Sequence, residues 1–336
     1  MRTRLVALGI VVAALIAFTA GLRARQEAEG WDFVPGERLL LYDDYTDMPK
    51  GAAPPHWKVR GGALGLVDGR LRAGGPATTM WPNIAKWPNN LTIEMDIAAS
   101  NKGIEDPNAD RSATWTFHAD GSEATVQLFF TGVGDCKLSL IIGGEAQHVE
   151  CKFLPEQPNK YAIWVQDGRL RFYLNGVRLM DVNQVKADFD GASLHLNGSP
   201  LPVTLGPFRI AESAPDVSKT LFATGRYVTH GILFDVNSDA IRKESAPVLQ
   251  QIAEALAAQP AVKLRIEGHT DSSGDPAQNL GLSKRRAEAV KNALVKQYGI
   301  AADRMTTEGF GDTKPTAKND TPQGRAENRR VEFVKL

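Results

Sequence analysis

The stretch IEGHTDSSGDPAQNLGLSKRRAEAV (266–290) decides the fold of the C-terminal third, because a strand pattern changes there into a helix pattern. Upstream, VKLRIEGHT (262–270) alternates apolar and polar residues, as a strand with one buried face does. Downstream, LSKRRAEAVKNALV (282–295) repeats apolar residues at helical spacing. We expect this helix to run to about Tyr298 and to stop at Gly299, which can take the left-handed conformation of a helix end. A strand followed by such a helix predicts an α/β domain.

Arg286 interrupts the apolar stripe of this helix. The inward-facing row should read Leu282, position 286, Val290 and Leu294. A guanidinium on that row needs an anionic partner, because an unpaired buried charge is very costly. An internal carboxylate such as Glu288 would serve, and so would a ligand carboxylate held by the guanidinium fork.

Asp271 supplies the opposite charge at the end of the preceding strand. It lies in the loop before the helix, at the kind of strand end where α/β sheets commonly bind ligands. Asp271 and Arg286 together would suit a zwitterion, with an ammonium on the first and a carboxylate on the second. The spacing is equally consistent with a plain Asp–Arg ion pair.

The remaining C-terminal elements follow from similar patterns. ESAPDVSKT lies in a polar stretch that we interpret as a linker over 212–224. Ser245 is the expected N-cap of a helix that ends near Ala258. We expect further strands at 231–236, 304–311 and 329–336, and a helical turn near Arg325.

Four blocks in this region resemble the OmpA-like peptidoglycan-binding domain, and the resemblance covers residues 225–336. The blocks are GILFDVNSDAI (231–241), the opening stretch 266–290, EGFGDTKP (308–315) and GRAENRRVEF (324–333). The resemblance implies a small sheet backed by helices in β-α-β-α-β order. It also implies recognition of diaminopimelate, the free amino-acid side chain of the peptidoglycan stem peptide.

The resemblance further implies a set of binding residues. Asp271 and Arg286 would be the ligand pair, and Asn279 and Arg329 would line the same pocket. For Asn279 and Arg329, capping of loops is an equally consistent role. Backbone around Phe234, Asp235 and Asn237 would close the pocket.

Residues 25–211 read as all-β. LTIEMDIAA (91–99) alternates apolar with polar residues, and similar runs recur at 113–119, 125–131, 137–142, 161–166, 170–174 and 202–210. Turn pairs such as Asp68-Gly69, Asp167-Gly168 and Asn175-Gly176 separate several strands. Many short strands with little helical periodicity predict a β-sandwich.

The two cysteines indicate a disulfide. A hairpin centred on Gly143-Gly144 would place Ile142 opposite Glu145, and therefore Cys136 opposite Cys151. Facing cysteines in an exported protein favour a bridge, worth on the order of 3 kcal/mol. Two separate buried thiols are the alternative.

YAIWVQDGRLRFYLNGVRLMDV (161–182) resembles the strand-turn-strand of concanavalin-like and laminin-G-like jelly rolls. That resemblance implies binding of a glycan or protein, and some such domains are glucanases. Related glucanases carry a Glu-x-Asp-x-(x)-Glu strand. Here Glu94 and Asp96 share a face, but residues 98 and 99 are both Ala, so we expect no catalysis. Trp81 and Trp87 would be sugar-stacking side chains if exposed, although packing is the commoner role of such residues.

The N-terminal segment and the net charge indicate where the protein is located and which ligands are excluded. Arg2 and Arg4 precede an apolar run to Leu22, which is typical of a signal peptide over 1–24, with an uncleaved anchor as the alternative. The formal net charge of zero argues against a nucleic-acid binder with a broad basic field. We therefore expect a non-catalytic protein of the periplasm, associated with the outer membrane, that needs no cofactor or metal and has peptidoglycan as its partner.

Overall fold

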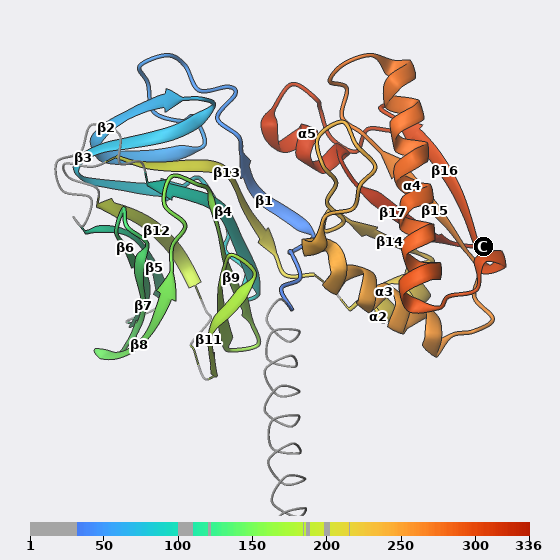
Figure 1. The fold of residues 1–336 in the computed structure, drawn as a ribbon, viewed down its shortest axis with the longest axis horizontal. Helices are drawn as coiled ribbons and strands as arrows, with labels where there is room; N and C mark the ends of the chain where they lie inside the picture. Colours follow the sequence, from blue (N-terminus) through green and yellow to red (C-terminus); the bar gives the residue numbers. More distant parts are fainter. Residues whose placement is uncertain are drawn as a thin grey trace, which may run out of the picture.

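The computed structural model describes residues 32–336 apart from 100–109, 120–121, 184, 186–188, 198–201 and 215. An all-β domain comes first, and a domain of mixed helices and strands follows (Figure 1). The expected signal peptide, 1–24, lies outside the described residues. Within the part of the chain that is described, no helix combines the length and apolarity that crossing a bilayer needs.

The strands described in the N-terminal domain form one 13-stranded sheet. Its main path runs β11-β10-β9-β4-β13-β3-β12-β5-β6-β7-β8, with β1 added to β13 and β2 to β3. The sheet curls until the end strands β8 and β11 approach each other. The strands are β1 (Arg38–Asp43), β2 (Trp57–Val67), β3 (Arg70–Pro82), β4 (Leu91–Ala99), β5 (Arg111–Ala119), β6 (Ser122–Phe130), β7 (Asp135–Ile142), β8 (Glu145–Lys152), β9 (Asn159–Gln166), β10 (Arg169–Leu174), β11 (Val177–Asn183), β12 (Phe189–Asn197) and β13 (Val203–Glu212).

The all-β prediction is therefore confirmed, but the arrangement differs from the sandwich that we expected. A sandwich has two separate sheets, whereas these strands are hydrogen-bonded into one continuous sheet. Alternation within a strand reports which residues are buried, and it does so correctly for β4, where Leu91, Ile93, Met95 and Ile97 are all buried. It carries no information on whether two distant strands pair or only face each other.

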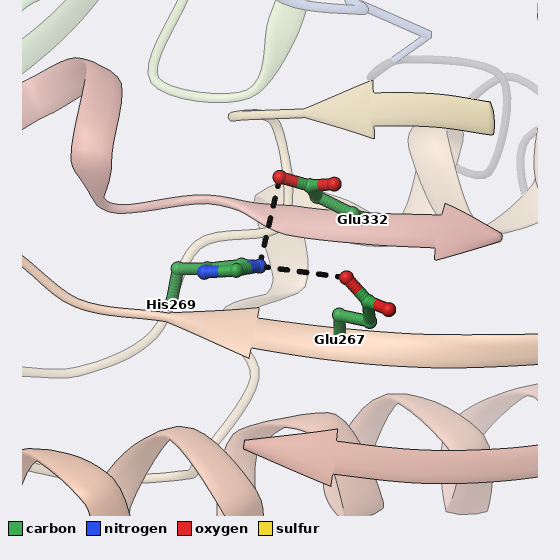
Figure 2. A group of neighbouring side chains, drawn as sticks. All are labelled: Glu267, His269 and Glu332. Carbon is green, nitrogen blue, oxygen red and sulfur yellow. Dashed lines mark ion pairs between the residues drawn. The ribbon is translucent and has the colours of Figure 1, made fainter. Parts of the chain in front are cut away.

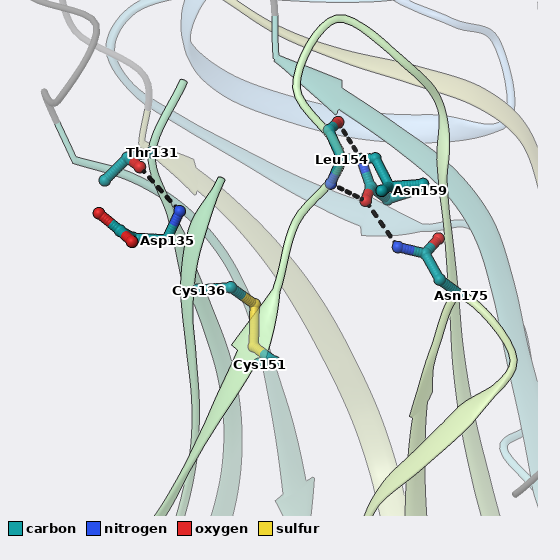
Figure 3. Close-up of a disulfide and its surroundings, with 7 residues drawn as sticks. All are labelled: Thr131, Asp135, Cys136, Cys151, Leu154, Asn159 and Asn175. Carbon is teal, nitrogen blue, oxygen red and sulfur yellow. Dashed lines mark hydrogen bonds between the residues drawn. A yellow bond between two sulfur atoms is a disulfide. The ribbon is translucent and has the colours of Figure 1, made fainter. Parts of the chain in front are cut away.

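The disulfide prediction is confirmed in both its bond and its register. Gly143 and Gly144 both have positive φ, and the turn sets Ile142 opposite Glu145. Cys136 then lies directly opposite Cys151, and the two are bonded (Figure 3). The bridge ties β7 to β8 at the end of the hairpin farthest from the turn.

The C-terminal domain has a four-stranded sheet in the order β14-β17-β15-β16. Strands β15 and β16 are parallel, and β17 is antiparallel to both of its neighbours. The elements are α2 (Val217–Thr224), β14 (Arg226–Thr229), η1 (Lys243–Ser245), α3 (Ala246–Ala258), β15 (Leu264–His269), α4 (Pro276–Tyr298), η2 (Ala302–Arg304), β16 (Met305–Gly311), α5 (Pro322–Asn328) and β17 (Val331–Lys335). Helix α4 ends, as predicted, before Gly299 with φ of 71°.

The predicted strand 231–236 is wrong. The segment is irregular apart from a single bridge between Phe234 and Ile241, and the first strand of the sheet is β14 instead. Its Leu233 backbone bonds to a turn and to a side chain, because the carbonyl accepts from the Arg242 N–H at 2.9 Å as well as from Ser245. The Ser245 hydroxyl accepts a hydrogen bond from the Leu233 N–H at 2.8 Å and donates one to the Leu233 carbonyl at 3.3 Å. Ser245 therefore makes no capping hydrogen bond to α3, contrary to our expectation.

The second half of the expected linker, 217–224, is helix α2. Asp216 caps its first turn by accepting a hydrogen bond from the Lys219 N–H, and Gly225 ends it in the left-handed conformation. Val217 and Leu221 are buried in the C-terminal core. This helix is consequently part of the C-terminal domain.

Two glycines let α4 lie directly on the sheet. A Cβ at Gly268 in β15 would stand 2.2 Å from the Ser283 carbonyl oxygen of α4, and a Cβ at Gly309 in β16 would stand 2.3 Å from the Lys284 nitrogen. Both contacts fall on the helical turn that carries Arg286. The close approach that these two glycines allow therefore determines where Arg286 lies relative to the ends of β15 and β16.

Candidate ligand-binding site

Arg286 is half-buried on α4, and its guanidinium is held by backbone carbonyls. Its Nε donates to the Ser238 carbonyl at 2.9 Å and its Nη2 to the Asp235 carbonyl at 3.4 Å. The guanidinium also lies over the Phe234 ring, 4.8 Å from the centroid. Among the residues that the structure describes, Arg286 makes no ion pair. The plain Asp271–Arg286 ion pair that the sequence left open is thus not formed.

Asp271 pairs with Arg329 instead. One carboxylate oxygen accepts from Arg329 Nη1 at 2.6 Å, and the other accepts from the Ser273 N–H at 2.9 Å. Burial raises the pKa of the Asp271 carboxyl, but the hydrogen bonds from Arg329 and Ser273 more than offset this, and the net pKa lies below its ordinary value. Asp271 is therefore ionised at neutral pH and retains lone pairs for a further donor.

Arg286 lies within the electrostatic reach of both members of that pair. Burial and then the neighbouring Arg329 guanidinium lower the pKa of Arg286, while Asp271 raises it. An arginine nevertheless stays protonated in proteins. The three side chains amount to two cations and one anion, so the group has an excess positive charge next to the carboxylate of Asp271.

The other predicted residues lie around this group in two different settings. The Asn279 amide is buried and donates to the carbonyls of Asp271 and Ser273, which is the loop-capping role. Asn237 has a positive φ of 54° in the exposed turn whose Asp235 carbonyl accepts from Arg286. Hydrogen bonds therefore connect the turn at Asp235 to Arg286, and Asn279 to the loop that carries Asp271.

A cavity of about 220 Å³ opens beside Arg286 and Arg329, between the two domains. Phe234 also lines it, whereas Asp271, Asn279, Asp235 and Asn237 do not. Its N-terminal wall includes Tyr42, Glu94 and Arg209. Tyr42 and Arg209 could not be predicted from the sequence, because no local pattern indicates that a strand of one domain borders a cavity of the other.

Glu267, His269 and Glu332 form a buried group on the face of β15 and β17 (Figure 2). His269 Nε2 lies 3.6 Å from a Glu332 oxygen and 3.9 Å from a Glu267 oxygen. Although the donor types would suit a metal ion, each carboxylate already has arginine partners. Arg265 pairs with Glu267, and Arg330 and Arg226 pair with Glu332. We therefore interpret the group as a buried charge network rather than a metal site.

His269 is expected to make the C-terminal domain less stable in mild acid. Burial, assisted by the Arg330 guanidinium, lowers the pKa of His269 from 6.5 to about 4. The unfolded chain therefore binds the proton first as the pH falls, and stability is lost between about pH 6.5 and 4. Over that window the wild type should lose about 3 kcal/mol more than His269→Gln.

Denaturant titrations at several pH values, followed by far-ultraviolet circular dichroism, measure this difference, because the described helices all lie in the C-terminal domain. Asp43 also contributes to the pH dependence of stability, but it is present in both wild type and His269→Gln, so its contribution cancels in the difference. Burial raises the pKa of Asp43 to about 6, so Asp43 stabilises in acid and loses that effect as the pH rises. Parallel pH curves for wild type and His269→Gln would show that His269 is not responsible.

The residues considered for glycan chemistry lie in different surroundings. Trp87 is buried in the N-terminal core, and Trp81 is partly buried on β3. Glu94 is paired with Arg209 at 2.6 Å, and Asp96 lies 3.6 Å from the Lys160 ammonium. Both carboxylates of the face that we tested for glucanase chemistry are thus engaged with cations.

The protein thus combines an all-β domain with an α/β domain, and a cavity lined by several arginines lies between the two. Comparison with known sequences gives its relationship. The pattern of the OmpA family matches residues 233–329. The putative lipoprotein YfiB of Escherichia coli is 39% identical over 127 residues, which is 38% of this chain and 75% of that protein. The chain belongs to the OmpA family through its C-terminal domain.

Other relatives share the same region. The outer-membrane lipoprotein YfiB of Pseudomonas aeruginosa is 44% identical over 103 residues, covering 31% of this chain and 61% of the relative. The outer membrane protein Omp38 of Acinetobacter baumannii is 39% identical over 132 residues, covering 39% of this chain and 34% of the relative. The chain spans about a third or less of the length of Omp38 and of the porins F with which it aligns. These relatives give the protein an envelope location, periplasmic and associated with the outer membrane.

Solved structures align with the same domain. The peptidoglycan-associated lipoprotein of Burkholderia pseudomallei is 33% identical, with 31% of this chain and 88% of that chain covered and a TM-score of 0.29. The cell wall anchor of the type VI secretion system of Pseudomonas aeruginosa is 31% identical, with 36% and 93% covered and a TM-score of 0.30.

Proposed function

We propose that the C-terminal domain holds this protein on peptidoglycan, without covalent chemistry, by binding the free amino-acid end of diaminopimelate in a stem peptide. Arg286 receives the carboxylate and Asp271 receives the ammonium. The observation that carries the proposal is that Arg286, a half-buried cation beside a cavity, makes no ion pair within the described chain. An arginine in that setting is suited to a ligand carboxylate.

The immediate surroundings of Arg286 and Asp271 support the two roles. The backbone carbonyls of Asp235 and Ser238 orient the guanidinium but carry no charge that would form an ion pair with it. The Asp271 carboxylate is held in place by Arg329 and Ser273, so it need not reorganise when an ammonium arrives. One such site binds modestly, and the wall presents many identical stem peptides at high local concentration.

A change in the ligand tests the proposal. A muropeptide monomer with diaminopimelate and one with lysine at the same position differ in a single side-chain carboxylate. The lysine form lacks this carboxylate and therefore cannot make its charge-assisted contact, which is worth about 1.5–3 kcal/mol. We expect the lysine form to bind about 10- to 100-fold more weakly. Isothermal titration of the full chain gives both affinities. Equal affinities would refute the proposed role of the carboxylate.

For the N-terminal domain we propose a non-catalytic role in recognition of a glycan or protein, as the sequence resemblance of residues 161–182 to strands of jelly-roll domains implies. The ion pairs of Glu94 with Arg209 and of Asp96 with Lys160 support a non-catalytic reading. A glucanase needs two carboxyl groups about 5–5.5 Å apart, one of them an acid able to donate a proton. The alternative, a carbohydrate-active enzyme tethered to the wall, would require Glu94 to leave its arginine.

A further inference from the structure

The two domains are joined by specific hydrogen bonds, some of them partly buried. The Glu37 carboxylate, just before β1, accepts from the Thr229 hydroxyl at 2.6 Å, the His230 N–H at 2.8 Å and the Tyr227 hydroxyl at 3.2 Å. Arg325 of α5 donates to the Thr46 hydroxyl at 2.7 Å. These contacts fix strand β1 against the C-terminal domain, and Figure 1 shows β1 running between the two domains.

Apolar contacts complete the interface. Leu39 of β1 and Ala211 of β13 pack with Ala326 of α5 in one buried cluster, against which Tyr42 also packs. The interface thus combines a nearly buried carboxylate with three hydrogen-bond donors and an apolar cluster. Because these groups are complementary in detail, the position of β1 beside the cavity is specified by the sequence of both domains.

The sheet register places three polar side chains of the N-terminal domain in one row facing the cavity. Tyr42 on β1 lies opposite Arg209 on β13, and Arg209 lies opposite Glu94 on β4. Residues directly opposite in antiparallel strands project from the same face. All three line the cavity that Arg286 and Arg329 line from the other side.

Tyr42 makes the link to the charged group. The Arg329 guanidinium lies over the Tyr42 ring, 5.5 Å from its centroid, and the same guanidinium holds Asp271 at 2.6 Å. A cation on the face of an aromatic ring is stabilised electrostatically, and more strongly where water is excluded. The ring therefore restrains the arginine that in turn restrains the ligand-binding carboxylate.

We infer that the ligand site is composite: the N-terminal domain forms one wall of the cavity beside Arg286 and Arg329, and Tyr42 is a positioning residue that acts through Arg329 on Asp271. This inference rests on the proposed function of the same site. It adds that affinity for the stem peptide depends on a residue outside the OmpA-like domain. Separation of the domains would consequently change ligand binding even if the C-terminal fold stayed intact.

A double-mutant cycle in the full chain tests this inference, with the diaminopimelate muropeptide monomer as the probe. Tyr42→Leu keeps apolar bulk against Leu39 and Ala326 but has no ring face. We expect it to weaken binding three- to tenfold in the wild-type background and less than twofold in an Arg329→Gln background, because the effect passes through Arg329. Tyr42→Phe keeps the ring and should stay within twofold of its parent.

The outcomes separate the two claims. No loss in Tyr42→Leu, or the same loss in both backgrounds, would overturn the positioning role while leaving the proposed function in place. A parent chain that does not bind the monomer would overturn the proposed function and this inference with it. Circular dichroism of each variant confirms that a loss of affinity is not a loss of fold.

Discussion

Arg286→Ala is expected to weaken binding of a diaminopimelate muropeptide by about 10- to 100-fold, since it removes one charge-assisted contact of about 1.5–3 kcal/mol. The loss should appear in affinity without a matching loss of stability. The contacts that Arg286 makes within the chain are two carbonyl hydrogen bonds and one ring contact at the edge of a cavity. Its removal leaves those carbonyls near water rather than in the core.

The adjacent residue on the same helix provides the control. Arg285 carries the same charge but is exposed, so Arg285→Ala changes the net charge of the chain identically. We expect it to bind within about twofold of wild type, because exposed charges are screened over about 10 Å at ordinary salt. If the two alanine variants bound equally, a general electrostatic attraction would explain binding better than a specific site.

Gly268→Ala is expected to destabilise the C-terminal domain by about 3 kcal/mol or more and to abolish ligand binding. The new Cβ would lie 2.2 Å from the Ser283 carbonyl oxygen. Since that atom belongs to the backbone of α4, no side-chain rotation relieves the clash, and the helix must move away from the sheet. Arg286, less than one turn farther along α4, would move with it.

Gly281→Ala in the same helix is the matched control. A Cβ there meets only the end of the Arg285 side chain at 3.5 Å. Because alanine is about 1 kcal/mol better than glycine inside a helix, we expect this variant to be slightly more stable than wild type. Denaturant unfolding followed by circular dichroism compares the two. A Gly268→Ala protein with wild-type stability would show that the close contact between α4 and β15 is not required.

The parts of the fold that the sequence predicts well depend on local rules. The strand at 91–99 matches β4 residue for residue, because a half-buried strand must alternate its side chains. The disulfide was predictable because a two-residue turn at Gly143-Gly144 determines the register of every later pair. Helix α4 ended where expected, since Gly299 tolerates the left-handed conformation.

The errors arise where a tertiary contact replaces a local one. GILFDV (231–236) has the composition of a strand, yet its Leu233 backbone bonds to the Ser245 hydroxyl and the Arg242 N–H instead of to a neighbouring strand, and no local sequence pattern predicts those partners. Residues 217–224, interpreted from the sequence as the second half of a linker, form a helix because Val217 and Leu221 bury against the C-terminal core. A single sheet, rather than a sandwich, required strand pairings that alternation alone does not specify.

In the candidate site, too, the identity of several residues could be predicted from the sequence, but their pairing could not. Sequence placed Asp271 and Arg286 near each other, and the family resemblance added Arg329 and Asn279. It could not show that Asp271 pairs with Arg329 rather than with Arg286, because the distance between two side chains depends on how α4 and α5 pack. Nor could it show that Tyr42, from the first strand of the other domain, lines the same cavity as Arg286 and Arg329.

A titration that varies both Arg286 and the side-chain carboxylate of the ligand measures directly whether the two groups contact each other. Wild type and Arg286→Ala are each titrated with the diaminopimelate and the lysine muropeptide. If the guanidinium of Arg286 binds the side-chain carboxylate, its removal should matter only for the diaminopimelate ligand, and both ligands should bind the variant almost equally. If Arg286→Ala weakens both ligands by the same factor, the carboxylate lies elsewhere and the account is contradicted.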